Sequence, residues 1–125
     1  MKRYIEIHCP RTLCDWLADC IRNYADVAFP PHCVDCQQVA RNALVQAAEE
    51  LRTSWADGQA RYNKRIRAFV KEAIRLHYRL LAAESGQATR AQCELMLELC
   101  QGVPHDERDL AAARAEDDAG PLPTA

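Results

Sequence analysis

Long apolar runs, glycine-rich segments and an export signal are all missing from this chain of 125 residues. No stretch of eighteen apolar residues occurs, so we expect no transmembrane helix and no binding to membranes. Residues 1–8 lack the apolar centre of a secretory signal. The length and the apolar content suit one domain with its own core. We therefore expect a cytoplasmic protein with a single domain.

Motifs that mark common enzyme classes are missing as well. None of the four glycines belongs to a phosphate-binding loop or to a Gly-x-Ser-x-Gly turn, and no His-Glu-x-x-His sequence occurs. His77 lies on the apolar face of a predicted helix, where we expect a hydrogen-bonded core histidine rather than a general base. We therefore expect no enzymatic activity and no resident cofactor.

What the sequence does contain is helical periodicity, and it predicts an all-α fold. Apolar residues recur at steps of three and four in four segments, which are Pro10 to Phe29, about Cys33 to Asp57, Gln59 to Glu84, and Arg90 to Gln101. Thr89 and Gln92 have the spacing of a capping box at the start of the last segment. The sequence therefore predicts a small helical bundle.

The segment from Gln59 to Glu84 is predicted to organise this bundle. As a helix it would extend for almost 40 Å at ~1.5 Å per residue. Only Asp57 and Gly58 separate it from the preceding helix, so we expect the two to form a long antiparallel helix hairpin. The fourth helix is too short to cover this hairpin, which predicts a homodimer packed through residues 38–55 and 61–81.

The two ends of the chain lack this periodicity. Residues 1–9 are predicted to form an extended arm, in which Ile5, Ile7 and Cys9 alternate with polar residues. No second strand pattern occurs, so we expect the arm to pair with a second copy or another protein. Residues 10–102 form the helical domain. Residues 103–125 are predicted to be a flexible, disordered acidic tail with no part in the core and at most one or two exposed helical turns over 106–115.

Seven cysteines occur, an odd number without an export signal, so we expect reduced thiols that serve mostly as small core residues. Cys33 and Cys36 form a Cys-x-x-Cys sequence at the opening of a predicted helix. This spacing is shared by zinc half-sites and dithiol redox sites. A zinc site would need His8 or Cys9 as further ligands, so zinc is an alternative to the expected absence of a cofactor.

Basic residues are concentrated between positions 61 and 79. A solvated helix face accounts for them, although such a helix could also follow a phosphate backbone. The sequence pI near 6.1 and the acidic tail oppose binding to nucleic acid. We therefore do not expect a nucleic-acid partner, and this class is kept as an alternative.

In size, in cysteine-rich composition, and in an arm at Ile5-Glu6-Ile7 followed by a run of helices with the long one at Gln59 to Glu84, residues 1–102 resemble a known family. These are the small bacterial quorum-sensing antiactivators that sequester LuxR-type transcription factors. The resemblance implies a regulatory protein that binds a transcription factor and disrupts its dimer without contacting DNA.

Aromatic and arginine side chains supply most interface energy, so exposed apolar or cationic residues on the arm and the long helices are the expected contacts with such a partner. On the arm and the long helices these are Tyr4, Ile5, Ile7, Trp16, Trp55, Tyr62 and Arg65. We expect alanine at Ile5 and Ile7 to weaken association without unfolding the bundle. Two alternatives stay open: a metal-binding or thiol-redox module centred on Cys33 and Cys36, and nucleic-acid binding through residues 61–79.

Overall fold

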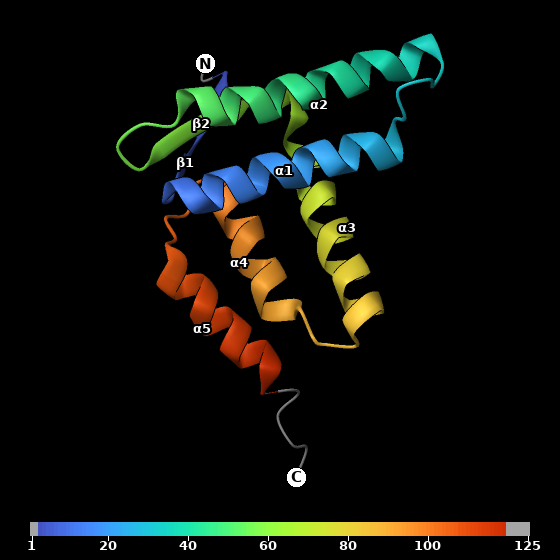
Figure 1. Cartoon of the computed structure of the whole chain (residues 1–125). Helices are drawn as coiled ribbons and strands as arrows, with labels where there is room; N and C mark the ends of the chain where they lie inside the picture. Colours follow the sequence, from blue (N-terminus) through green and yellow to red (C-terminus); the bar gives the residue numbers. More distant parts are fainter. Residues whose placement is uncertain (1–2, 120–125) are drawn as a thin grey trace.

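The computed structural model describes residues 3–119, which form five α-helices and one small antiparallel sheet (Figure 1). In chain order the elements are β1 (Tyr4–His8), α1 (Arg11–Ala28), α2 (Asp35–Ser54), β2 (Gln59–Asn63), a 3-10 turn (Lys64–Ile66), α3 (Arg67–Ser85), α4 (Arg90–Cys100) and α5 (Glu107–Asp118). The fold is predominantly helical, but it is α+β rather than all-α as predicted.

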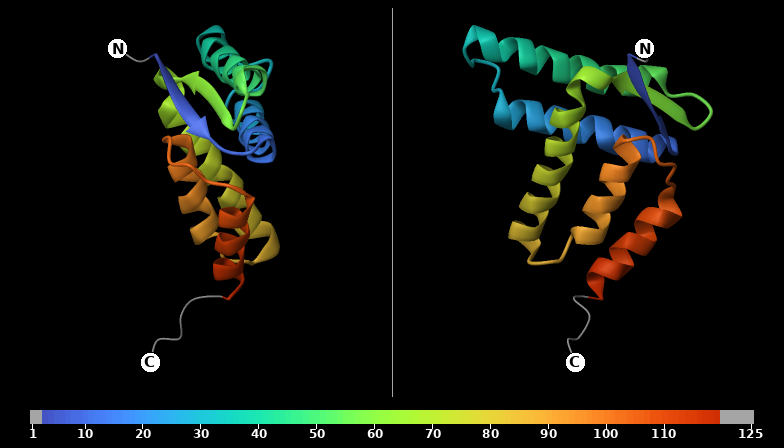
Figure 2. Two further views of the ribbon diagram at one scale, coloured as in Figure 1. Left: turned by 90° about the vertical axis from the view of Figure 1, so that its left-hand side faces the viewer. Right: turned by 180° about the vertical axis from the view of Figure 1, so that it is seen from behind.

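Two layers are visible in the arrangement of the helices. α1 and α2 lie antiparallel, and α3, α4 and α5 extend away from them on one side (Figures 1 and 2). α1 is central because it packs against both α2 and α3. Leu17 and Ile21 of α1 are fully buried, as are Leu44 and Leu51 of α2. The antiparallel helix hairpin is therefore α1–α2.

The predicted helix from Gln59 to Glu84 is wrong in its first part. Asp57 and Gly58 have φ of 51° and 81°, and Ala56 and Gln59 exchange backbone hydrogen bonds of 2.8 and 3.0 Å across them. An Asp-Gly pair favours this tight turn, because both positions require a positive φ. The chain therefore reverses as a strand, and the helix begins only at Arg67.

β2 gives the arm a partner within its own chain. The antiparallel register places Ile5 opposite Tyr62 and Ile7 opposite Ala60. Ile7, Ala60 and Tyr62 are buried. The prediction that the arm lacks an intrachain partner is therefore wrong. The alternation of Ala60 and Tyr62 is hidden in the sequence by a helical spacing that continues into α3.

Part of the predicted acidic tail is a helix. α5 begins with a capping box, in which Asp109 N–H donates to Asp106 Oδ1 and Asp106 N–H donates to Asp109 Oδ2. Leu110 and Ala113 are buried against the rest of the fold. Residues 107–118 are thus structured, and residues 120–125 of the predicted tail lie outside the described residues.

The last turn of α5 also caps the start of α4. The carboxylate of Asp117 accepts hydrogen bonds from Ala91 N (2.8 Å), Gln92 N (3.0 Å) and Gln92 Nε2 (3.0 Å). The capping box predicted within residues 89–92 does not form, because the Thr89 side chain makes no cap bond. A residue remote in sequence therefore satisfies this helix end.

The other predicted helices are confirmed to within a few residues. α1 lies between Pro10 and Phe29, and α3 ends at Gly86 in a left-handed conformation. α4 packs on both α3 and α5, which explains its apolar circumference. Over residues 3–119, no helix combines the length and the apolarity needed to cross a membrane.

Candidate protein-binding surfaces

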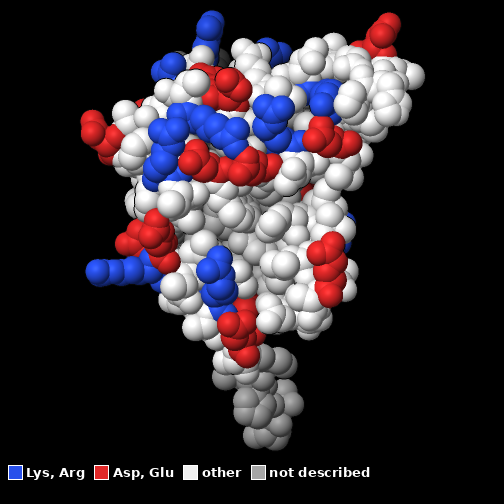
Figure 3. Space-filling view, in the orientation of Figure 1, with Lys and Arg blue, Asp and Glu red and all other residues white. Residues whose placement is uncertain are grey.

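An apolar groove of about 220 Å³ lies between α1 and α3. Val27 and Leu80 remain 62% and 48% exposed there, and both contribute to the same groove. The rest of the lining combines Cys20, Tyr24, Ala73, Leu76 and Leu81 with the polar side chains of Asn23, His77 and Glu84. In Figure 3 the surface beneath α1 is largely uncharged, whereas charged side chains gather along α1 and α2.

A small aromatic cluster adjoins the groove. Trp16 stacks on Tyr78 with ring centroids 5.6 Å apart, and it meets His77 edge-on at 4.9 Å. Burial lowers the pKa of His77 below its usual 6.5, so this ring is neutral at neutral pH. The cluster therefore adds aromatic surface to the groove without adding charge.

Two of the predicted contact residues are core residues instead. Ile7 and Tyr62 are fully buried, and the Tyr62 hydroxyl donates a hydrogen bond to the Cys100 carbonyl of α4. Ile5 lies on the same inner face of the sheet and is half-buried. The prediction that alanine at Ile7 spares the fold is therefore wrong, because Ile7 and Tyr62 hold the sheet on the helices.

The remaining predicted contact residues are scattered over the molecule. Trp55 is half-buried and donates its Nε1 hydrogen to the Cys9 carbonyl at 3.0 Å. Tyr4 lies on the outer face of the sheet beneath Arg61, whose Cζ is 4.6 Å from the ring centroid. Arg65 is exposed in the 3-10 turn. Trp16 contacts His77, which lines the groove, whereas Tyr4, Trp55 and Arg65 lie elsewhere.

Five of the seven thiols belong to the folded interior. Burial raises the pKa of Cys9 and Cys20 to about 12 and the pKa of Cys14 and Cys100 to about 11, and it also raises that of the half-buried Cys93. Cys14 and Cys20 donate their Sγ hydrogens to the carbonyls of residues 51 and 73. These cysteines act as small core residues.

Cys33 and Cys36 differ because they lie around the start of α2, where Cys33 is half-buried and Cys36 is exposed. His8 and Cys9 precede α1, whereas Cys33 follows it. The 18 residues of α1 separate them by about 27 Å at ~1.5 Å per residue. The alternative metal site made of these four residues is therefore wrong. Nowhere in residues 3–119 do three His, Cys, Asp or Glu side chains gather as metal ligands.

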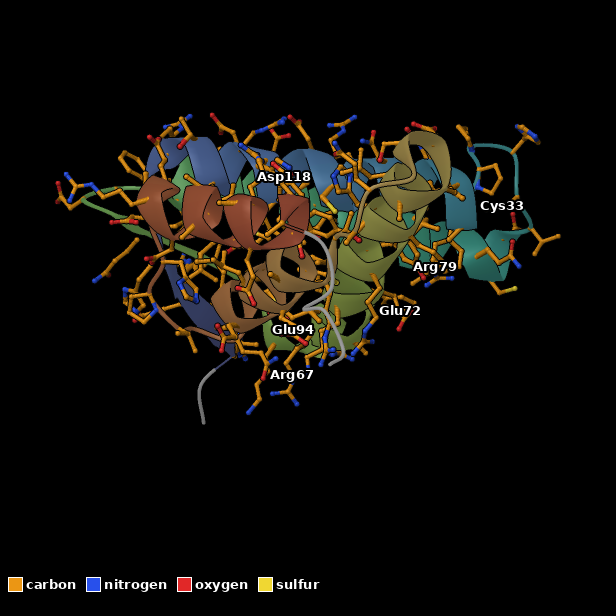
Figure 4. All side chains as sticks on the ribbon, turned by 90° about the horizontal axis from the view of Figure 1, so that it is seen from below. Cys33, Arg67, Glu72, Arg79, Glu94 and Asp118 are labelled. Carbon is orange, nitrogen blue, oxygen red and sulfur yellow. The ribbon has the colours of Figure 1, made fainter. Side chains whose placement is uncertain are left out.

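The continuous basic helix proposed for residues 61–79 is also absent, since Arg61 is in β2 and α3 begins at Arg67. Along α3, Arg75 pairs with Glu72 at 2.7 Å. In the view from below, Arg67 points outward from the beginning of α3, on a different side of the molecule from Cys33 (Figure 4). Arg61, Lys64 and Arg67, at the start of the segment, instead line a hollow along β1.

The groove residues Val27 and Leu80 are missing from the predicted contacts. Leu80 lies on the apolar stripe of its helix, so the sequence predicts that a neighbour covers it. Val27 continues the stripe of Tyr24 by one helical step. The available signal is that both stripes extend past the neighbours that cover them.

Comparison of the chain with models of protein families, with characterised proteins and with solved structures finds no match.

Proposed function

We propose that this protein acts by binding another protein, and that the groove between α1 and α3 receives an amphipathic helix of the partner. The exposure of Val27 and Leu80 within one apolar groove supports this proposal. Covering apolar surface contributes about 25 cal/mol per Å². A groove with helical walls suits the apolar face of a helix, with anchors spaced by three or four residues.

The regulatory role that we propose is inhibition of a transcription factor by occupying its dimerisation surface. The resemblance to antiactivators in size, in cysteine content and in an arm followed by helices supports this class of partner, although the long helix of that layout begins only at Arg67. The neutral aromatic cluster at Trp16 and His77 suits an apolar dimerisation helix. A LuxR-type transcription factor is therefore the first partner to test. A second copy of the chain is the competing occupant of the groove.

Affinity capture with matched surface variants tests this proposal. Leu80→Glu places a charge in the groove, whereas Val39→Glu makes the same change at a site on α2 that is 71% exposed. We expect the native protein and Val39→Glu to retain one stoichiometric partner from a lysate of the host, and Leu80→Glu to lose it. Circular dichroism should show equal helicity for all three.

Two results would count against the proposal. Retention of the same partner by Leu80→Glu would move the interface away from the groove. Failure of the native protein to retain any partner, together with no binding to a purified LuxR-type transcription factor, would remove the proposed function itself.

A further inference from the structure

We infer that the outer edge of β1 is a second docking site, whose ligand is an extended acidic segment of another protein. This segment would add a third strand to the sheet. The inference goes beyond the proposed function and does not depend on the groove between α1 and α3. Sheet edges with unpaired backbone groups accept such strands through main-chain hydrogen bonds.

The ladder fixes which residues of β1 face outward. Lys64 N–H donates to Arg3 O at 2.9 Å, and Cys9 N–H donates to Gly58 O at 3.0 Å. In an antiparallel pair such bonds recur at every second residue. The odd-numbered residues of β1 therefore bond to β2, and the backbone groups of Tyr4 and Glu6 point to the outer edge.

That outer edge is open along only part of its length. Among residues 3–119, no group bonds to Tyr4 N–H, Tyr4 C=O or Glu6 N–H. Beyond Glu6 the loop after α4 closes the edge, since His105 N–H donates to His8 O at 3.1 Å. Gly102 lies so close that a Cβ there would be 3.3 Å from Glu6 O. The open part therefore presents three backbone groups in order: Tyr4 N–H as a donor, Tyr4 C=O as an acceptor and Glu6 N–H as a donor.

The opposite side of the sheet is closed. Gln59 exchanges backbone hydrogen bonds with Ala56, and Arg61 N–H donates to Ser54 Oγ at 3.0 Å. β2 therefore lies between α2 and β1, and β1 is the outermost strand (Figure 2). Within the described residues, an added strand has one place to pair.

The charge beside this edge selects the ligand. A hollow of about 500 Å³ lies along β1, and its charged lining consists of Arg3, Glu6, Arg61, Lys64 and Arg67. Four cations and one carboxylate give this lining a net charge of +3, although the whole chain carries -2. Arg61 is shared with Glu50, which lies 3.4 Å away. The lining therefore attracts acidic side chains next to the open backbone.

Competing ligands fit this site less well. A second copy of the chain would bring the same cations against each other. A nucleic acid would match the cations, but its phosphates only accept hydrogen bonds and leave Tyr4 C=O without a donor. A peptide backbone supplies both donors and acceptors in the required alternation.

Direct binding to a defined probe tests the inference. The probe is a short fluorescein-labelled peptide with the core Glu-Val-Asp-Val-Glu-Val, measured by fluorescence anisotropy at low and moderate salt. We expect the native protein to bind it more weakly as salt rises, because salt screens the cations. An analogue with lysine at each acidic position should not bind.

A pair of variants at Glu6 isolates the backbone contribution. Glu6→Ala and Glu6→Pro both remove the carboxylate, but only proline removes the outward N–H. Proline is tolerated at a strand edge, and it favours the extended conformation that Ile5 already has. We expect Glu6→Ala to bind at least as tightly as the native protein. Glu6→Pro should bind about tenfold more weakly than Glu6→Ala, as expected for one lost hydrogen bond.

A second pair isolates the charge and decides the matter if Glu6→Pro fails to fold. Lys64→Glu should weaken binding of the acidic peptide, whereas the same charge change at the exposed Arg108 of α5 should not. Leu80→Glu should bind the peptide normally, so that a failure of this site and a failure of the groove give different results.

Several outcomes would overturn the inference. Equal affinities of Glu6→Pro and Glu6→Ala, or of Lys64→Glu and Arg108→Glu, would show that the peptide does not use this edge. Tighter binding of a thymidine oligonucleotide would assign the cations to nucleic acid. Loss of a native dimer in Glu6→Pro would assign the edge to a second copy.

Discussion

Asp117 joins the end of α5 to the beginning of α4 through one carboxylate. Burial on its own raises the pKa of this group, but the hydrogen bonds from Gln92 and Ala91 outweigh burial and hold the pKa below its usual 3.8. The group is therefore ionised at neutral pH. Its negative charge lies at the amino-terminal end of α4, where the helix dipole favours it.

Replacement of this carboxylate should weaken the whole fold. We expect Asp117→Ala to lower the free energy of unfolding by about 1–2 kcal/mol at pH 7, the usual effect of losing a helix cap. Urea titration followed by circular dichroism measures the change. Asp118→Ala removes the same charge from an exposed neighbour and should cost less than about 0.5 kcal/mol.

The effect of Asp117 should also depend on pH. A carboxyl group with a folded-state pKa below its unfolded-state value stabilises the fold fully above the unfolded value, which is near 3.8. That contribution disappears as the pH falls through the lower, folded-state pKa. The difference between the native protein and Asp117→Ala should therefore shrink below about pH 4. An equal difference at pH 3 and pH 7 would contradict the ionised cap.

The thiols should separate into two kinetic classes. Cys36 is exposed and Cys33 is half-buried near the start of α2, whereas the other five are buried or half-buried within the fold with raised pKa values. We expect Ellman's reagent to modify two thiols rapidly in the native protein and all seven in denaturant. Serine at Cys33 and Cys36 should remove the rapid class. If more than two thiols react rapidly, the interior is more open than the structure indicates.

At the scale of elements, local signals predict helices better than they predict the sheet. The segments of α1 and α4 and the end of α3 carry their own periodicity and breakers, and these are confirmed. The sequence does not predict β2, because its five residues fit helical spacing as well as alternation. Only pairing with β1 selects the strand. The Asp57-Gly58 turn was the local signal that could have revealed it.

The sheet should contribute to stability through its inner face. We expect Ile7→Ala to lower the free energy of unfolding by about 2–5 kcal/mol, because the truncation leaves a cavity against α4 and β2. Tyr4→Ala, on the outer face of the same strand, should cost far less. Thermal unfolding followed by circular dichroism compares them. Similar losses for both variants would mean that β1 packs differently.

The contacts that complete the fold join residues remote in sequence. Asp117 caps α4, Tyr62 donates to Cys100, and His105 donates to β1. No local pattern indicates any of these contacts, so the sequence predicts a tail where the structure has α5. For the same reason the groove was not predicted, since it exists only where α1 and α3 cross.

At the scale of the whole molecule, the homodimer stays a prediction. The long helix that motivated it is a strand followed by a shorter helix, so the groove is now the apolar surface that a second copy could cover. If a second copy rather than another protein occupies the groove, light scattering should give a mass of twice 14.1 kDa at micromolar concentration, and one chain for Leu80→Glu. A native mass of one chain would contradict the dimer and leave the groove to a different partner.

The described chain begins and ends on opposite sides of the molecule (Figure 1). Arg3 lines the hollow beside the outer edge of β1, whereas Ala119 follows the far end of α5. A purification handle fused before Arg3 would therefore compete with a strand docked at the proposed edge site, whereas Ala119 lies away from that site. Immobilisation beyond Ala119 would leave the proposed site at the β1 edge free, whereas an amino-terminal handle would conceal it.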